Sequence, residues 1–139
     1  MELRIGAELI ESTVFASIRK TLSMKEGTVI DPNGLLERDL GMDSIDMLDV
    51  LHSIEKSLKI SIELLDFAAY FRGSLSEEAF RDENGLLTEE GRMQVQAVLP
   101  HAAVEAGMHI RHLFKVLRVT DFLTFVLVKA EQHVHSAIS

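Results

Sequence analysis

One short run of the sequence places a serine hydroxyl where it could be modified. The run extends from Asp39 to Leu48 and reads DLGMDSIDML. Asp43 and Ser44 both have capping side chains and precede apolar residues at helical spacing, so a helix is predicted to begin at one of them. Gly41 would let the incoming backbone turn tightly and leave room for another molecule to approach. A hydroxyl at such a helix start is exposed, and an anion attached to it would lie in a favourable electrostatic field.

A second group of residues has the types that bind metal ions. Glu105, His109 and His112 lie at offsets of four and three, so one face of a helix could present all three. Two imidazoles and one carboxylate can bind zinc and leave one coordination position open. No His-Glu-x-x-His motif and no separate general base accompany them, so we predict no metal site and treat both histidines as surface or half-buried residues.

The apolar residues that must position these groups recur at helical spacing, which predicts an all-α fold. Helices are expected over residues 7–24, 43–58, 63–71, 88–99, 101–118 and 121–133, with a further helix start at Ser76. Thr120 is expected to cap the last of them. Between the first two helices, a loop after Pro32 carries three leucines that are expected to plug the core, namely Leu35, Leu36 and Leu40.

Length and charge narrow the class of protein. The chain has 139 residues, which predicts a single domain over residues 1–139. Its net charge is −8, and residues 31–66 alone hold nine acids and three bases, for a net charge of −6. Such a segment repels nucleic acid and anionic lipid but attracts basic protein surfaces, so neither nucleic-acid binding nor membrane insertion is expected. Cysteine is absent, and residues 1–6 lack the pattern of a secretory leader, so we expect a cytoplasmic protein.

The run around Ser44 closely resembles the attachment-site motif of acyl and peptidyl carrier proteins, an apolar-Gly-x-Asp-Ser-Leu/Ile signature. The resemblance extends over roughly residues 7–63, because the first two predicted helices and the loop between them match the family in order and length. It resumes over residues 119–129, where the sequence VTDFL is similar to the start of the family's last helix. The resemblance implies an acyl-carrier-like four-helix bundle.

The resemblance also implies a cofactor and a role. In this family the motif serine is esterified to 4′-phosphopantetheine, and here that residue is Ser44, with Asp43 as its neighbour in the motif. The protein would then be a carrier and not an enzyme, holding acyl intermediates as thioesters and delivering them to enzymes of fatty acid, polyketide or specialised lipid synthesis. The charge of Asp43 would repel an added phosphate, so we expect Asp43 to help the modifying enzyme, or a metal ion carried by that enzyme, to bind.

The partners implied are a phosphopantetheinyl transferase and acyl-processing enzymes such as acyl transferases and ketosynthases. Asp46, Asp49 and Glu55 on the second helix would dock onto basic patches of these enzymes, which mainly raises encounter rates and specificity. Apolar residues between the helices could shelter an acyl chain, and the candidates are Met47, Leu51 and Ile62.

The chain is longer than a typical carrier protein, and the additional residues lie at about 66–116. We call this segment the insert. Its apolar content predicts that it forms helices that pack onto the bundle. Four roles are open for it: enlarging an acyl cavity, binding a dedicated partner, mediating self-association, or none.

Two other functional classes remain as alternatives. The chain could be a carrier-like adaptor that acts by protein binding and is never modified. It could also be a small metal-dependent helical enzyme that uses the group around Glu105. Modification of Ser44 distinguishes the first alternative from the carrier, and bound metal distinguishes the second.

Overall fold

A computed structural model describes residues 6–63 and 65–138, and it places side chains up to residue 132. The expectation that the chain lacks a leader concerns residues 1–6 and so lies almost wholly outside this range. Every regular element in the described residues is helical, as predicted. The elements are α1 (Ala7–Thr21), α2 (Ser44–Leu58), α3 (Leu65–Arg72), α4 (Glu77–Phe80), α5 (Glu89–Val98), the 3₁₀ helix η1 (Ile110–Val116) and α6 (Val119–Ile138).

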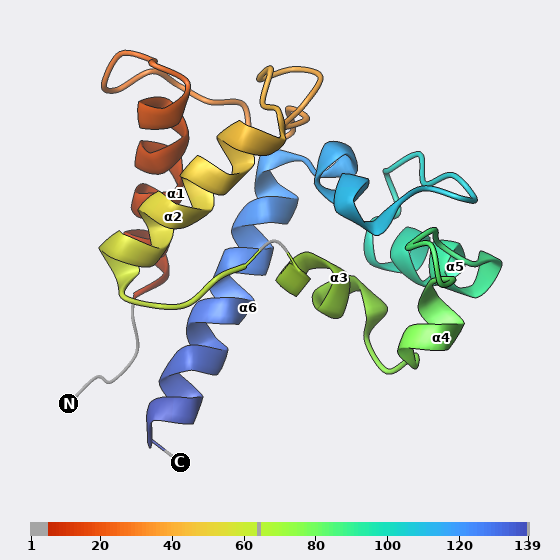
Figure 1. The fold of residues 1–139 in the computed structure, drawn as a ribbon. Coiled ribbons are helices and arrows are strands. Elements are labelled where there is room, and N and C mark those ends of the chain that lie inside the picture. Colours follow the sequence, from red (N-terminus) through yellow and green to blue (C-terminus); the bar gives the residue numbers. More distant parts are fainter. Residues whose placement is uncertain (1–5, 64, 139) are drawn as a thin grey trace.

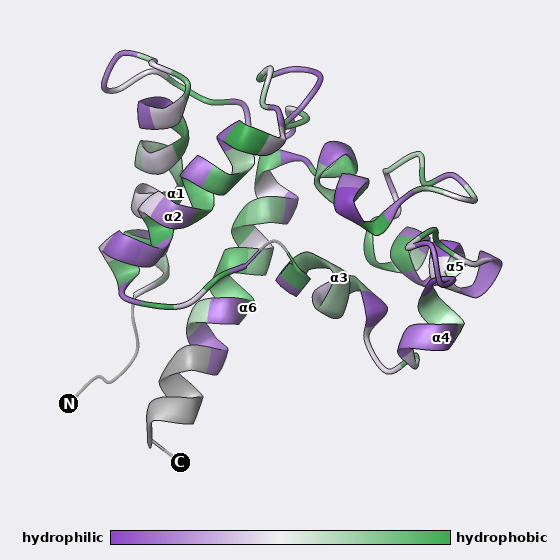
Figure 2. Ribbon diagram, in the orientation of Figure 1, coloured by the Kyte–Doolittle hydropathy of each residue, from purple (hydrophilic) through white to green (hydrophobic). Residues whose placement is uncertain are grey.

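Helices α1, α2 and α6 enclose the main core (Figure 1). Their hydrophobic residues gather on the sides that face one another, while hydrophilic residues cover the outer sides (Figure 2). Residues at four-residue and three-residue steps make these faces, as amphipathic helices require. The buried side chains include Ile10, Val14 and Ile18 of α1, Met47, Leu51 and Ile54 of α2, and Phe122, Phe125 and Val126 of α6.

Helix α3, the first helix of the insert, packs against this core. Phe67 of α3 stacks on Phe125 of α6 with 4.2 Å between ring centroids, and it lies 6.0 Å from Phe122. Asp66 and Lys129 form an ion pair at 3.5 Å across the same two helices. On its other sides α3 contacts α5 and η1. The insert therefore packs onto the bundle through α3, as its apolar content predicted.

Helices α4 and α5 begin at the capping residues that the sequence predicted. Ser76 accepts a hydrogen bond from the N–H of Ala79 at 3.1 Å, and Thr88 accepts one from the N–H of Gly91 at 3.0 Å. The Thr88 hydroxyl also donates to the carbonyl oxygen of Ala79, and the Thr88 N–H donates to that of Phe80. These bonds draw the start of α5 against the end of α4.

The long helix predicted over residues 101–118 is wrong. Residues 100–109 form turns and extended backbone, and only η1 is helical. The reason is non-local pairing: the N–H of Leu87 donates to Met108 at 2.8 Å, and the N–H of Ile110 donates to Gly85 at 2.9 Å. These bonds use backbone groups that a continuous helix would have needed for its own ladder.

Other predicted helix ends also differ, and α6 continues to Ile138, beyond the predicted end at residue 133. Helix α1 ends at Thr21, three residues early, and Ser23 takes a left-handed conformation with φ of +56°. Thr120 does not cap α6, because it lies inside the helix and its N–H donates to the Pro32 carbonyl at 2.9 Å. The start of α6 is instead held by Asp121, whose carboxylate accepts from the Arg118 N–H at 2.9 Å.

The close approach of α4 and α5 requires glycine at residue 91. A Cβ atom added to Gly91 would overlap the carbonyl oxygen of Phe80. We expect Gly91→Ala to lower the free energy of unfolding by about 1–3 kcal/mol, because an overpacked backbone contact must move apart. Met93→Ala is the matched control, since Met93 is exposed on the same helix and its truncation should change stability by less than about 0.5 kcal/mol. Chemical denaturation measures both; equal stability of the two variants would contradict the packing described.

Candidate functional site

Ser44 is the first residue of α2, and its side chain is exposed. Asp43 is the N-cap: its carboxylate accepts a hydrogen bond from the N–H of Asp46 at 2.8 Å. The carboxylate of Asp46 in turn accepts from the N–H of Asp43 at 3.1 Å, which completes a capping box. Asp43 therefore stabilises the start of α2, and of the two capping residues that the sequence offered, Asp43 and Ser44, it is the one that caps the helix.

The loop before α2 is closed by its own hydrogen bonds. The N–H of Met42 donates to Leu36 at 3.0 Å, and the N–H of Leu35 donates to the Asp39 carboxylate at 2.7 Å. Gly41 has φ of +77°, a conformation that residues with a Cβ rarely adopt. Of the three leucines predicted to plug the core, Leu36 is buried, whereas Leu35 and Leu40 are only half-buried. Met42, which was not predicted, is buried as well. This closed loop fixes the direction from which the chain enters α2.

Backbone pairing joins this loop to the segment between η1 and α6. The N–H of Leu36 donates to Leu117 at 3.0 Å, and the N–H of Val119 donates to Gly34 at 2.9 Å. Leu35 and Arg118 form an antiparallel bridge between these bonds. Because Leu117 directly follows η1, the pairing holds η1 beside the start of α2.

A cleft of about 680 Å³ lies between the start of α2 and η1. Its apolar lining comes from Met42, Leu48 and Phe114, and Ser44 lies in its wall. Charged and titratable groups complete the lining: Glu37 and Asp43 on the α2 side, and Arg111, His112 and Lys115 on η1. Sequence reasoning considered His112 only as a metal ligand and did not connect any η1 residue with Ser44, because no local spacing relates them and only the backbone pairing brings them together.

The η1 side of the cleft is electropositive. Desolvation beside the cleft lowers the pKa of His112, and the nearby Lys115, His109 and Arg111 lower it further. Glu37 acts in the opposite direction and pairs with Lys115 at 3.5 Å. The cleft therefore brings a cationic surface to an exposed hydroxyl at a helix N-terminus.

The three acids predicted to bind partners differ in exposure and in the hydrogen bonds that their carboxylates accept. Asp49 is exposed, whereas Asp46 is half-buried and takes part in the capping box. Glu55 is also half-buried, and its carboxylate accepts from the N–H of Ile62 at 3.1 Å. Ile45 and Leu48, which the sequence argument did not single out, are 67% and 50% exposed. Their positions outside the core stripe of α2 were the available signal.

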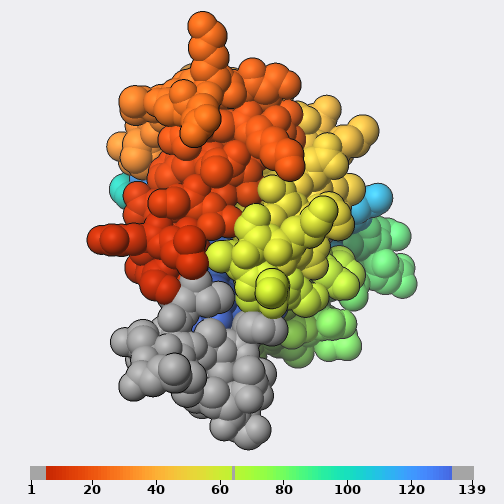
Figure 3. Space-filling model, turned by 90° about the vertical axis from the view of Figure 1, so that its left-hand side faces the viewer, coloured from red at the N-terminus to blue at the C-terminus, as the bar shows by residue number. Residues whose placement is uncertain are grey.

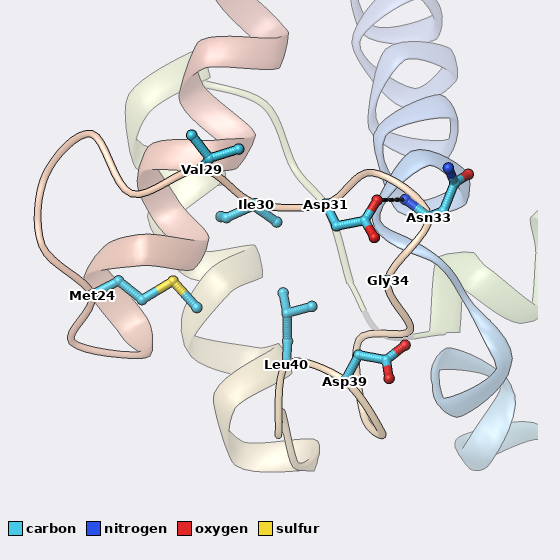
Figure 4. A pocket seen from close by; sticks show the side chains of 8 residues that line it. All are labelled: Met24, Val29, Ile30, Asp31, Asn33, Gly34, Asp39 and Leu40. Atoms are coloured by element: carbon cyan, nitrogen blue, oxygen red, sulfur yellow. Dashed lines mark hydrogen bonds between the residues drawn. The ribbon is translucent and has the colours of Figure 1, made fainter.

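The residues proposed to shelter an acyl chain are packed into the core. Met47, Leu51 and Ile62 are each no more than 2% exposed. A separate hollow of about 480 Å³ lies within the connection between α1 and α2, over residues 24–40 (Figure 4). Met24, Ile30 and Leu40 line it, and Asp31 accepts there from the N–H of Asn33 at 2.9 Å. Ser44 is not among its lining residues.

The structure does not place Glu105, His109 and His112 on one helical face, because the helix predicted over these residues does not form. The Nδ1 atom of His109 accepts from the N–H of Arg111 at 3.0 Å, and the two imidazole rings lie 6.0 Å apart. Among residues 6–63 and 65–132, no three histidine, aspartate or glutamate side chains are grouped closely enough to hold a metal ion. No helix in the part of the chain that the structure describes is long and apolar enough to cross a membrane.

Comparison with known proteins identifies the segment that carries Ser44. Residues 12–71, less than half of the chain, match the family described as phosphopantetheine attachment site. The matched segment contains α2 and nearly all of α3, so it includes the first residues assigned to the insert. No curated protein and no solved structure gave a significant match. Residues 12–71 are therefore similar to the phosphopantetheine attachment-site family, whose members carry a covalent 4′-phosphopantetheine group.

Proposed function

We propose that Ser44 carries the 4′-phosphopantetheine group and that the chain delivers acyl intermediates to biosynthetic enzymes of fatty acid, polyketide or other lipid synthesis. The observation that carries this proposal is the exposed hydroxyl of Ser44 at the first position of α2, inside the segment that matches the family. Ser44 lines an open cleft, so a transferase can reach it.

The residues around Ser44 fit an attached phosphodiester. The N-terminus of α2 carries a partial positive charge, and Arg111 and Lys115 line the same cleft. The group would supply a terminal thiol on which an acyl cargo is held as a thioester. The chain's own residues would anchor and orient its root, and no general base or oxyanion hole is needed for that task. We therefore propose a carrier that is not itself an enzyme.

The surface beside Ser44 suits weak docking to basic partner enzymes. Asp49 is exposed on α2, and the apolar side chains of Ile45 and Leu48 are exposed close to Ser44. Figure 3 shows α1 and α2 lying side by side on one face, with the insert visible only at its margin. Charged contacts of this kind raise association rates without tight binding, which suits a shuttle. The lack of cysteine fits a reducing compartment such as the cytoplasm.

The test of the carrier function is covalent loading. Incubation with coenzyme A and a phosphopantetheinyl transferase should raise the intact mass by one phosphopantetheine group in the wild type, and Ser44→Ala should show no increase. Thermal denaturation of Ser44→Ala serves as the folding control. A wild-type chain that no competent transferase loads would instead be the unmodified adaptor.

Asp43 offers a way to separate stability from recognition. Asp43→Ala should lower the free energy of unfolding by about 1 kcal/mol, because the cap of α2 is lost. Asp43→Asn should keep most of that stability, since asparagine caps equally well. If the carboxylate serves the transferase, both variants should be loaded more slowly than wild type. Loading of Asp43→Asn at the wild-type rate would remove any role of its charge in recognition.

The docking role of the acidic surface predicts a salt-dependent rate. Asp49→Asn should lower kcat/KM for the transferase by about two-fold or more at low salt, and the difference should shrink as salt screens the charge. Glu83→Gln is the control, because it removes one exposed negative charge from the turn between α4 and α5. Equal effects of the two substitutions would mean that net charge alone, and no docking site on α2, sets the rate.

A further inference from the structure

A basic surface faces Ser44 from a segment that lies outside the family match. Arg111, His112 and Lys115 all belong to η1, and all three side chains are exposed. They line the same 680 Å³ cleft as Ser44. The match ends at residue 71, so η1 is an addition to the matched carrier segment.

Without η1, the start of α2 would be a poor place for another anion. Glu37 and Asp43 line the cleft beside Ser44, and Asp46 follows in the first turn. A phosphodiester on Ser44 would add a negative charge close to these carboxylates, and like charges repel. The helix N-terminus offsets part of this repulsion, but the N–H of Asp46 already donates to the Asp43 carboxylate.

The cations of η1 supply positive charge to this site. The formal charges of Arg111 and Lys115 balance those of Glu37 and Asp43, so the cleft lining is near neutral before an anion is added. The Lys115–Glu37 pair is long, at 3.5 Å, and both side chains are more than 40% exposed. Exposed pairs of this kind are weak, so Lys115 can exchange Glu37 for a phosphate oxygen.

We propose that Arg111 and Lys115, assisted by His112, bind the phosphodiester at Ser44 and hold the root of the arm against η1. This inference rests on the proposed function, because it assumes that Ser44 is loaded. In this inference, η1 supplies the positive charges that balance the negative charge of the phosphodiester. The four roles considered from sequence did not include it.

The arrangement makes His112 a reporter of the attached group. The charged and titratable groups that face it are Lys115, His109, Arg111 and Glu37, and their sum together with burial lowers its pKa. A phosphodiester added to this cleft opposes the cations, so it should raise the pKa of His112. Loading should therefore extend the protonated form of His112 to higher pH than in the unloaded protein.

The first test is a titration of His112 by NMR in unloaded and loaded wild-type protein. We expect loading to raise the pKa of His112 by about 0.5 unit, because one negative charge is added to the cleft that His112 lines. Intact mass is measured on the same samples. An adduct on Ser44 with an unchanged pKa of His112 overturns the inference and leaves the carrier function standing, whereas the absence of any adduct rejects both.

The second test addresses the two permanent cations. In the loaded protein, the ³¹P resonance of the phosphodiester should shift with salt in wild type, and Arg111→Gln/Lys115→Gln should lose most of that shift. Lys20→Gln/Lys25→Gln is the matched control, since it removes two exposed lysines outside the cleft and should behave as wild type. A cleft variant that is loaded more slowly but keeps the wild-type ³¹P response would place these cations in the encounter with the transferase and overturn the inference.

Discussion

Backbone pairing between residues 32–36 and 117–120 is the interaction on which the site depends. The amides of Leu36, Val119 and Thr120 donate to carbonyls across this junction at 2.9–3.0 Å. Leu36, Leu117 and Val119 are buried there, so the bonds lie beside apolar side chains and are shielded from water. A buried amide left without its partner costs more than the bond contributes, which makes this junction hard to open locally. Since the loop over residues 32–36 leads into α2 and Leu117 directly follows η1, the pairing holds these two helices near each other.

This junction brings the positive charges of η1 close to the acidic segment that carries Ser44. The segment that carries Ser44 is the most acidic part of the chain, which favours basic partners but disfavours a second anion. Because η1 lies across the cleft, Arg111 and Lys115 place positive charge beside Ser44, while Asp49 on α2 stays exposed. In the proposed carrier, Asp49 on α2 would attract partners, whereas Arg111 and Lys115 of η1 would retain the anionic group.

The packing of the insert leaves this arrangement intact. Helix α3 lies in the matched segment, stacks its Phe67 on α6 and contacts α5 and η1 on its other sides. The additional helices therefore extend the core from one flank of the bundle, and the face made by α1 and α2 stays uncovered by them (Figure 3). Ser44 and Asp49 remain exposed as a result.

The sequence by itself determined the features that depend on neighbouring residues. The all-α fold, both ends of α2, and the starts of α4 and α5 follow from helical periodicity and capping side chains, which act within one turn. The exposure of Ser44 follows from its place at a helix start. Only the tertiary structure decided two other features. The segment 101–118 is not one continuous helix, and Thr120 pairs with Pro32 and does not cap α6. In both cases backbone groups bond partners more than 20 residues away, and local spacing carries no record of such partners. The meeting of Ser44 with Arg111 and Lys115 has the same origin, because it exists only once the chain has closed on itself.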